Sequence, residues 1–138
     1  MTASPTLSIP PLGRNKLILS NPSFSDSLID EFTASLEVDG LQASATIDDY
    51  LGGGLPEFFQ DLAEHWQEWS GEKVWKSRDG VLQIACTSDR TGQHQMAVTL
   101  DPARLMSTPW TVKATLQIEA GQLEQISNTS RAFFAFHQ

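Results

Sequence analysis

Two runs of alternating apolar and polar residues, joined by Asp39-Gly40, constrain the fold of this chain more than any other feature. Their apolar members are Phe32, Ala34, Leu36 and Val38 in the first run, then Leu41, Ala43, Ala45 and Ile47 in the second. Because successive side chains of a strand point to opposite faces, each run predicts a strand with one apolar face. Asp-Gly favours a type I′ turn, which needs a positive φ at both central residues. We therefore predict a β-hairpin over residues 32–47.

A helix is predicted after this hairpin. Its apolar stripe consists of Leu55, Phe58, Phe59, Leu62, Trp66 and Trp69, which recur at helical spacing. Pro56 fits the first turn, and Ser70-Gly71 fits the end, with Gly71 as a left-handed cap. The preceding Gly52-Gly53-Gly54 lacks the Lys-Ser/Thr of a phosphate-binding loop, so we interpret it as a hinge.

The rest of the chain is rich in short alternating runs. The predicted strands are Lys16–Ser20, Lys73–Ser77, Val81–Thr87, His94–Leu100 and residues 110–119, with a turn at Arg78-Asp79-Gly80 that joins the second and third of these strands into another hairpin. A closing helix is predicted around Leu123, Ile126, Ser130, Phe133 and Phe134.

The order of these elements predicts the fold class. We expect an α+β fold with a single antiparallel sheet of about six strands and two helices packed on one face. Residues 1–13, which contain three prolines and a glycine, are predicted as a flexible lead-in, and residues 14–138 as a single domain. Since strands and helices do not alternate as βαβ, we expect no dinucleotide crevice and no cofactor.

Charge is strongly segregated along the chain. The net charge is −8, and no lysine or arginine occurs between Leu17 and Glu72. The acids of this stretch are Asp26, Asp30, Glu31, Glu37, Asp39, Asp48, Asp49, Glu57, Asp61, Glu64, Glu68 and Glu72. Such a field disfavours nucleic acid and anionic membranes as ligands and favours a basic protein partner.

Four of these acids are predicted to share one face of the first helix. Glu57, Asp61, Glu64 and Glu68 follow the spacing i, i+4, i+7 and i+11, opposite the apolar stripe. Like charges at i, i+4 cost a few tenths of a kcal/mol per pair. This face is either an acidic solvated surface or a docking surface for a basic protein such as a toxin. We add Asp48 and Asp49 to the candidate partner-binding residues. Their spacing does not fit a calcium loop, so we expect no metal site there.

No catalytic constellation is recognisable. His65, His94 and His137 are scattered, and the spacing of a zinc-binding helix is absent from the sequence. The single cysteine, Cys86, lies in an alternating run that predicts a buried, inert thiol. The protein is therefore expected to be non-enzymatic and to bind no metal, although whether it is an enzyme stays open. The alternatives are a small-ligand-binding domain or enzyme, and a homo-oligomeric structural protein joined through the edge strand Lys16–Ser20.

The N-terminal sequence lacks a basic segment followed by a long apolar one, and no run approaches the ~18 apolar residues of a membrane span. These features predict a cytoplasmic protein. Trp66, Trp69 and Trp75 lie close together in the sequence and are mostly expected in the core, although Trp69 or Trp75 is a candidate exposed anchor at an interface.

One stretch carries a family resemblance. Residues 69–77 read Trp-Ser-Gly-Glu-Lys-Val-Trp-Lys-Ser. Two further segments belong to the same pattern, Leu55-Pro56-Glu57-Phe58-Phe59 before this stretch and Trp110-Thr111-Val112 after it. With these segments the chain resembles, from about Leu17 to Phe134, a family of small bacterial proteins of unknown function. In length and element order it also resembles the WapI-type immunity proteins, which neutralise a contact-delivered toxin. That second resemblance implies an acidic, cytoplasmic immunity protein and no catalytic residues.

Overall fold

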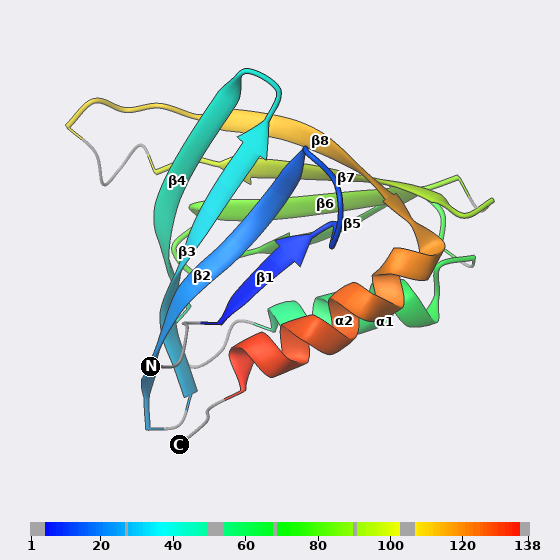
Figure 1. Cartoon of the computed structure of the whole chain (residues 1–138), viewed down its shortest axis with the longest axis horizontal. Coiled ribbons are helices and arrows are strands. Elements are labelled where there is room, and N and C mark those ends of the chain that lie inside the picture. The colour runs from blue at the N-terminus through cyan, green and yellow to red at the C-terminus, as the bar shows by residue number, and fades with distance from the viewer. Residues whose placement is uncertain are drawn as a thin grey trace.

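The computed structural model describes residues 5–26, 28–49, 54–67, 69–89, 91–102 and 107–135. Within them the chain forms two antiparallel four-stranded sheets and two helices (Figure 1). The strands are β1 Thr6–Ile9, β2 Lys16–Ser25, β3 Leu28–Val38, β4 Leu41–Asp48, β5 Glu72–Lys76, β6 Leu82–Ser88, β7 Gln93–Leu100 and β8 Val112–Glu119, and the helices are α1 Leu55–Glu64 and α2 Ala120–Phe134. Neither of these two helices is long and apolar enough to cross a membrane.

The first sheet has the order β1-β2-β3-β4, so each strand pairs with its neighbour in the chain. The predicted hairpin is confirmed as β3 and β4, with Val38 paired to Leu41 across a two-residue turn. Only Gly40 of the two turn residues has a positive φ, 74°, so the turn is not the type I′ that Asp-Gly favours. Thr6–Ile9, inside the predicted lead-in, forms β1 and pairs with β2.

The second sheet has the order β5-β6-β7-β8. Its four strands coincide closely with the strands predicted between Lys73 and Glu119, and its first hairpin turns at Arg78-Asp79-Gly80. β7 alternates buried and more exposed residues, and Leu82, Ile84 and Cys86 of β6 are buried, as expected for a sheet with one covered face.

The prediction of a single antiparallel sheet of about six strands with both helices on its apolar face is wrong. Alternation identifies a strand and its apolar face, but it does not say which strands pair. Here α1 separates two complete meanders, and the apolar face of each sheet is buried in a core that both sheets share. The helices consequently lie side by side along one side of the two sheets instead of covering one of them (Figure 1).

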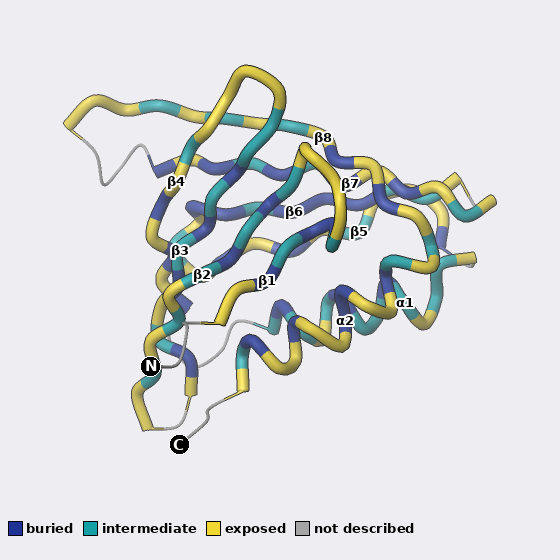
Figure 2. The backbone as a smooth tube through the Cα atoms, in the orientation of Figure 1, coloured by how far each residue is buried: buried dark blue, intermediate teal, exposed yellow. Residues whose placement is uncertain are grey.

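Both sheets and both helices contribute to one continuous core (Figure 2). Its fully buried members include Leu17 and Phe32 in the first sheet, Ile84 in the second and Phe59 in α1. Burying a side chain of this size contributes about 1.5–3 kcal/mol. The ring of Phe32 also meets Phe133 of α2 edge to face, with ring centroids 6.3 Å apart, which fixes α2 against the first sheet.

The predicted closing helix is confirmed as α2, whereas the first helix is shorter than predicted. α1 ends at Glu64, where His65 leaves the helical conformation with φ −121°. Trp66 and Trp69, which continued the apolar spacing in the sequence, instead contact His94 of β7. Gly71 has the expected positive φ of 76°, but it precedes β5 and does not cap the helix.

Candidate functional site

The acids predicted on the first helix have different surroundings. Glu57, in the first turn of α1, and Glu64, at its last residue, are both exposed. Asp61 lies between them and is half-buried. Glu68 follows the end of α1 and lies outside the described residues. The described acidic face of α1 therefore consists of two outward-facing carboxylates with a third between them.

Asp61 is already paired within the protein. Its Oδ2 lies 2.6 Å from Nζ of Lys73 in β5, and its Oδ1 lies 3.0 Å from Nδ1 of His65. The hydrogen bond from Lys73 is the main reason that the pKa of Asp61 is lower than its ordinary value, with smaller contributions from the charges of Lys73 and His65. Asp61 thus anchors α1 to the second sheet and contributes little net charge to the surface.

Asp48 and Asp49 lie at the end of β4, not on the helices. Asp48 is exposed, and its backbone N–H donates a 2.9 Å hydrogen bond to Oδ2 of Asp79. Asp49 is 0% exposed, and its N–H donates to the carbonyl of Asp30 at 2.8 Å. Only Asp48 of this pair is therefore accessible to a partner.

A groove between the helices brings Glu64 together with residues that the sequence analysis did not identify as part of a site. Its volume is about 280 Å³. Gln60, Ala63 and Glu64 line it from α1, and Glu124, Ser127, Asn128 and Arg131 line it from α2. The helices run in opposite directions (Figure 1), so the last turn of α1 lies beside the first turns of α2. The packing of the helices thus brings Glu64 and Glu124, far apart in the sequence, to one hollow.

The tryptophan motif has a structural role in this fold. Trp69 and Trp75 are 6% and 8% exposed, so neither is an exposed anchor. The Trp69 ring stacks on His94 with centroids 5.1 Å apart, and Nζ of Lys73 lies 5.6 Å from the Trp69 centroid. These contacts pack the chain after α1 against the second sheet.

His94 is the most unusual polar residue of the core. It is 2% exposed, and both ring nitrogens are buried without a hydrogen-bond partner. Burial lowers its pKa, and the charge of Asp89 partly opposes this effect. His94 is consequently neutral at pH 7 and packs like an aromatic residue.

Groups suited to catalysis or metal binding are not gathered in the described part of the chain. No three His, Cys, Asp or Glu side chains of these residues form a group that could hold a metal ion. Cys86 is buried, and burial is the main reason that its pKa is raised to about 12. The thiol is therefore protonated and unreactive at neutral pH.

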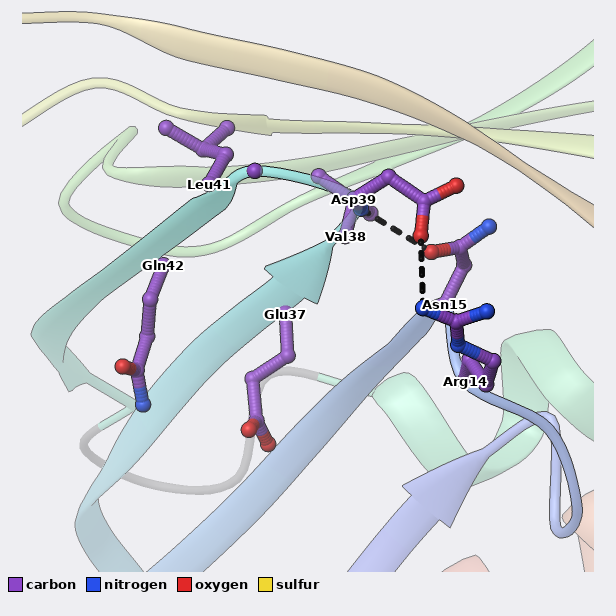
Figure 3. Close-up of a pocket in the computed structure, with 8 residues that line it drawn as sticks. Arg14, Asn15, Glu37, Val38, Asp39, Leu41 and Gln42 are labelled. Carbon is purple, nitrogen blue, oxygen red and sulfur yellow. Dashed lines mark hydrogen bonds and ion pairs between the residues drawn. The ribbon is translucent and has the colours of Figure 1, made fainter.

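A second hollow lies at the tip of the β3–β4 hairpin. It measures about 440 Å³, and Figure 3 shows its lining residues around the ion pair between Arg14 and Asp39. The closest nitrogen and oxygen of this pair are 3.8 Å apart, and both side chains are mostly exposed. Arg14 and Asp39 already face each other in open solvent, where an ion pair contributes little free energy.

The chain matches a protein-family model over most of its length. Residues 11–137 match a family of unknown function, DUF6228. No curated protein matches the chain. The predicted resemblance to a family of unknown function is thus confirmed at that level.

Proposed function

This chain belongs to the DUF6228 family of unknown function, and we propose that it is a non-enzymatic binding protein for a basic protein partner. The observation that carries the proposal is the set of exposed carboxylates Glu57, Glu64 and Glu124 on two neighbouring helices. In the described part of the chain none of the three forms an ion pair. A positively charged protein surface can supply the missing counter-charges.

The charge of the whole molecule supports this assignment. A net charge of −8 steers positively charged partners toward the protein and repels nucleic acid and anionic membranes. Exposed charges of this kind mainly raise the association rate, and their effect weakens as salt screens them. Complex formation should therefore be fast at low ionic strength and clearly salt-dependent.

The kind of binding protein that agrees best with these features is a cytoplasmic immunity protein. In such a protein the acidic helices would cover the basic active surface of a toxin, as the resemblance to WapI-type immunity proteins implies. Occlusion needs no catalytic residues, which agrees with a protonated Cys86 and a buried His94. In such an immunity protein the Trp-x-Gly-Glu-Lys-x-Trp-x-Ser stretch would stabilise the fold and would not contact the toxin, since its Trp69 and Trp75 are buried.

Two matched variants test the proposal. The first, Glu57→Gln/Glu64→Gln/Glu124→Gln, neutralises the helix carboxylates. The second, Glu31→Gln/Glu37→Gln/Glu72→Gln, removes the same charge from strands. Wild type and the strand variant should capture a stoichiometric basic protein from host lysate at low salt and release it at high salt, whereas the helix variant should lose it. Equal capture by both variants, or no basic protein on the wild type, would contradict the proposal.

A further inference from the structure

The second sheet ends in an edge strand whose outer backbone groups are unused. β5 is the first strand of the order β5-β6-β7-β8 (Figure 1), and among the described elements it has extensive contact with β6 alone. The Ser77 N–H donates to the Leu82 carbonyl at 2.8 Å, which fixes the alternation of hydrogen bonds between β5 and β6. Every second residue of β5 therefore bonds to β6, and the residues between direct their N–H and C=O groups away from it. These outward residues are Glu72, Val74 and Lys76. In the described part of the chain, none of the three has a backbone hydrogen bond to another element.

The other edge strands of the described sheets differ from β5 in this respect. β1 packs against α2. At the end of β4 the Asp48 N–H donates to Asp79, and at the end of β8 the Glu119 N–H donates to Oε1 of Gln122. The predicted edge strand Lys16–Ser20 lies within β2, between β1 and β3, so it is not an edge. Of these strands, β5 is therefore the one best suited to pair with a strand from outside the molecule.

The side chains on the exposed face of β5 form a pattern that is complementary to itself. Val74 is 44% exposed and lies at the centre of the strand, with the acid Glu72 before it and the base Lys76 after it on the same face. The Cα atoms of the two charged residues are separated by about 13 Å along a strand, too far for an ion pair within one copy. Their neighbours on β6 are the neutral residues Thr87 and Gln83. Among the described residues neither charge forms an ion pair.

We propose that β5 pairs with β5 of a second copy of this chain, antiparallel and about a two-fold axis at Val74. In this register Glu72 of each copy lies opposite Lys76 of the other copy, so all four charges are paired. The same register brings the outward N–H and C=O groups of the two strands together as hydrogen-bonded pairs. A two-fold interface uses the same patch on both copies, which is what a strand with an acid, an apolar residue and a base in this order fits. Parallel pairing would instead place acids beside acids.

The pairing creates a continuous sheet of eight strands, four from each copy. The paired strands are only five residues long, so the interface is far smaller than the roughly 1,200–2,000 Å² of a standard one. The net charge of −8 on each copy also opposes association. We therefore expect a weak dimer that forms as the protein concentration rises. It goes beyond the proposed function and is independent of it, because it uses β5 and leaves the helices free for a basic partner.

Sedimentation equilibrium of the full chain at about 0.15 M salt tests the pairing. The weight-average mass of the wild type should rise from the monomer value toward twice that value between about 10 μM and about 1 mM. Lys76→Glu should weaken the association by about tenfold or more, because both symmetry-related pairs then carry like charges. Lys113→Glu is the matched control on the exposed face of β8. It changes the net charge equally and should leave the association within about twofold of the wild type.

Reversal of the acid separates pairing from general repulsion. Glu72→Lys lowers the net negative charge, so it would strengthen an association limited only by repulsion, whereas the paired strands predict a weakening of about tenfold or more. An equimolar mixture of Glu72→Lys and Lys76→Glu should regain the association, since every pair across the mixed interface then has opposite charges. Glu72→Lys/Lys76→Glu, which exchanges the two charges, should associate like the wild type.

Val74→Pro removes the central outward N–H. Because this N–H makes no bond to β6, the variant should keep the circular dichroism of the wild type and lose the association. Hydrogen exchange gives a second measurement, in which the amides of Glu72, Val74 and Lys76 should exchange more slowly in the dimer than in the monomer.

A wild type that stays monomeric up to about 1 mM would overturn the proposal. An association that Lys113→Glu weakens as much as Lys76→Glu does, or one that Glu72→Lys strengthens, would also overturn it, because the interface would then not depend on the charge order of β5. Unchanged exchange of the three outward amides at concentrations where the mass has doubled would have the same meaning.

Discussion

Lys73 and Asp61 connect the first helix to the second sheet. The Nζ of Lys73 in β5 lies 2.6 Å from Oδ2 of Asp61 in α1, and the same Nζ lies 5.6 Å from the centroid of the Trp69 ring. One cation thus contacts the helix, the chain that leaves it and the sheet. Asp61, which the sequence analysis assigned to partner binding, instead mainly stabilises the contact between α1 and β5.

The first prediction concerns stability and pH at Asp61. Its pKa is lowered in the folded protein, so its contribution to stability is present above the ordinary value of 3.8 and is lost as the pH falls below that value. Asp61→Asn should lower the free energy of unfolding at pH 7 by less than about 1 kcal/mol, since the Asp61 side chain is 44% exposed. Urea unfolding at pH 7 and pH 3 should show the difference shrink at the lower pH. A difference that grows on acidification would show that the ion pair is not its source.

The second prediction concerns His94. Burial lowers its pKa, so the stability associated with the neutral ring is complete above the ordinary value of 6.5 and declines as the pH falls below it. His94→Phe keeps an aromatic ring against Trp69 and removes two buried nitrogens without partners. The free energy of unfolding of this variant at pH 7.5 should be within about 1 kcal/mol of the wild-type value, or higher, because apolar atoms replace both unsatisfied nitrogens.

Urea unfolding between pH 7.5 and pH 5 checks this second prediction. Wild type should lose stability over this interval, and His94→Phe should lose less. His65→Gln is the control, because His65 is partly exposed and paired with Asp61. If the variant and wild type keep parallel pH profiles, His94 does not titrate as its burial implies.

The sequence was sufficient to locate most strands but not to assemble them. β3 and β4 were predictable because Asp39-Gly40 joins two alternating runs, so a local turn determines their pairing. β1 is only four residues long and is flanked by prolines, so it was not predicted as a strand. The division into two sheets depends on how the apolar faces pack after α1, and that is a tertiary property without a local pattern.

The same limit applies to the candidate site. Helical spacing correctly put Glu57, Asp61 and Glu64 on α1, but it did not reveal the partner of Asp61, because Lys73 lies on the next strand. Glu124 and Ser127 carried no signal beyond their place on the predicted closing helix. Only the packing of α2 beside α1 shows that Glu124 lines the same groove as Glu64.

The third prediction concerns Cys86. The thiol is 2% exposed and its pKa is raised to about 12, mainly by burial, so it should not react with Ellman's reagent in the native protein at pH 8. Modification should occur only through unfolding and should accelerate in parallel with the unfolded fraction as urea increases. Rapid stoichiometric labelling in buffer alone would contradict the burial of Cys86.

The last prediction concerns Asp79, in the turn between β5 and β6. Its Oδ1 accepts hydrogen bonds from Oγ of Ser77 at 2.6 Å and from the Val81 N–H at 3.0 Å, and its Oδ2 accepts one from the Asp48 N–H at 2.9 Å. Asp79 therefore connects the end of the first sheet to a turn of the second. Asp79→Ala removes all three bonds and should lower the free energy of unfolding by about 2 kcal/mol. Asp79→Asn retains the Oδ1 acceptor and should cost about half as much. Chemical unfolding of the two variants measures both values, and equal losses would mean that the turn bonds to Ser77 and Val81 contribute nothing to stability.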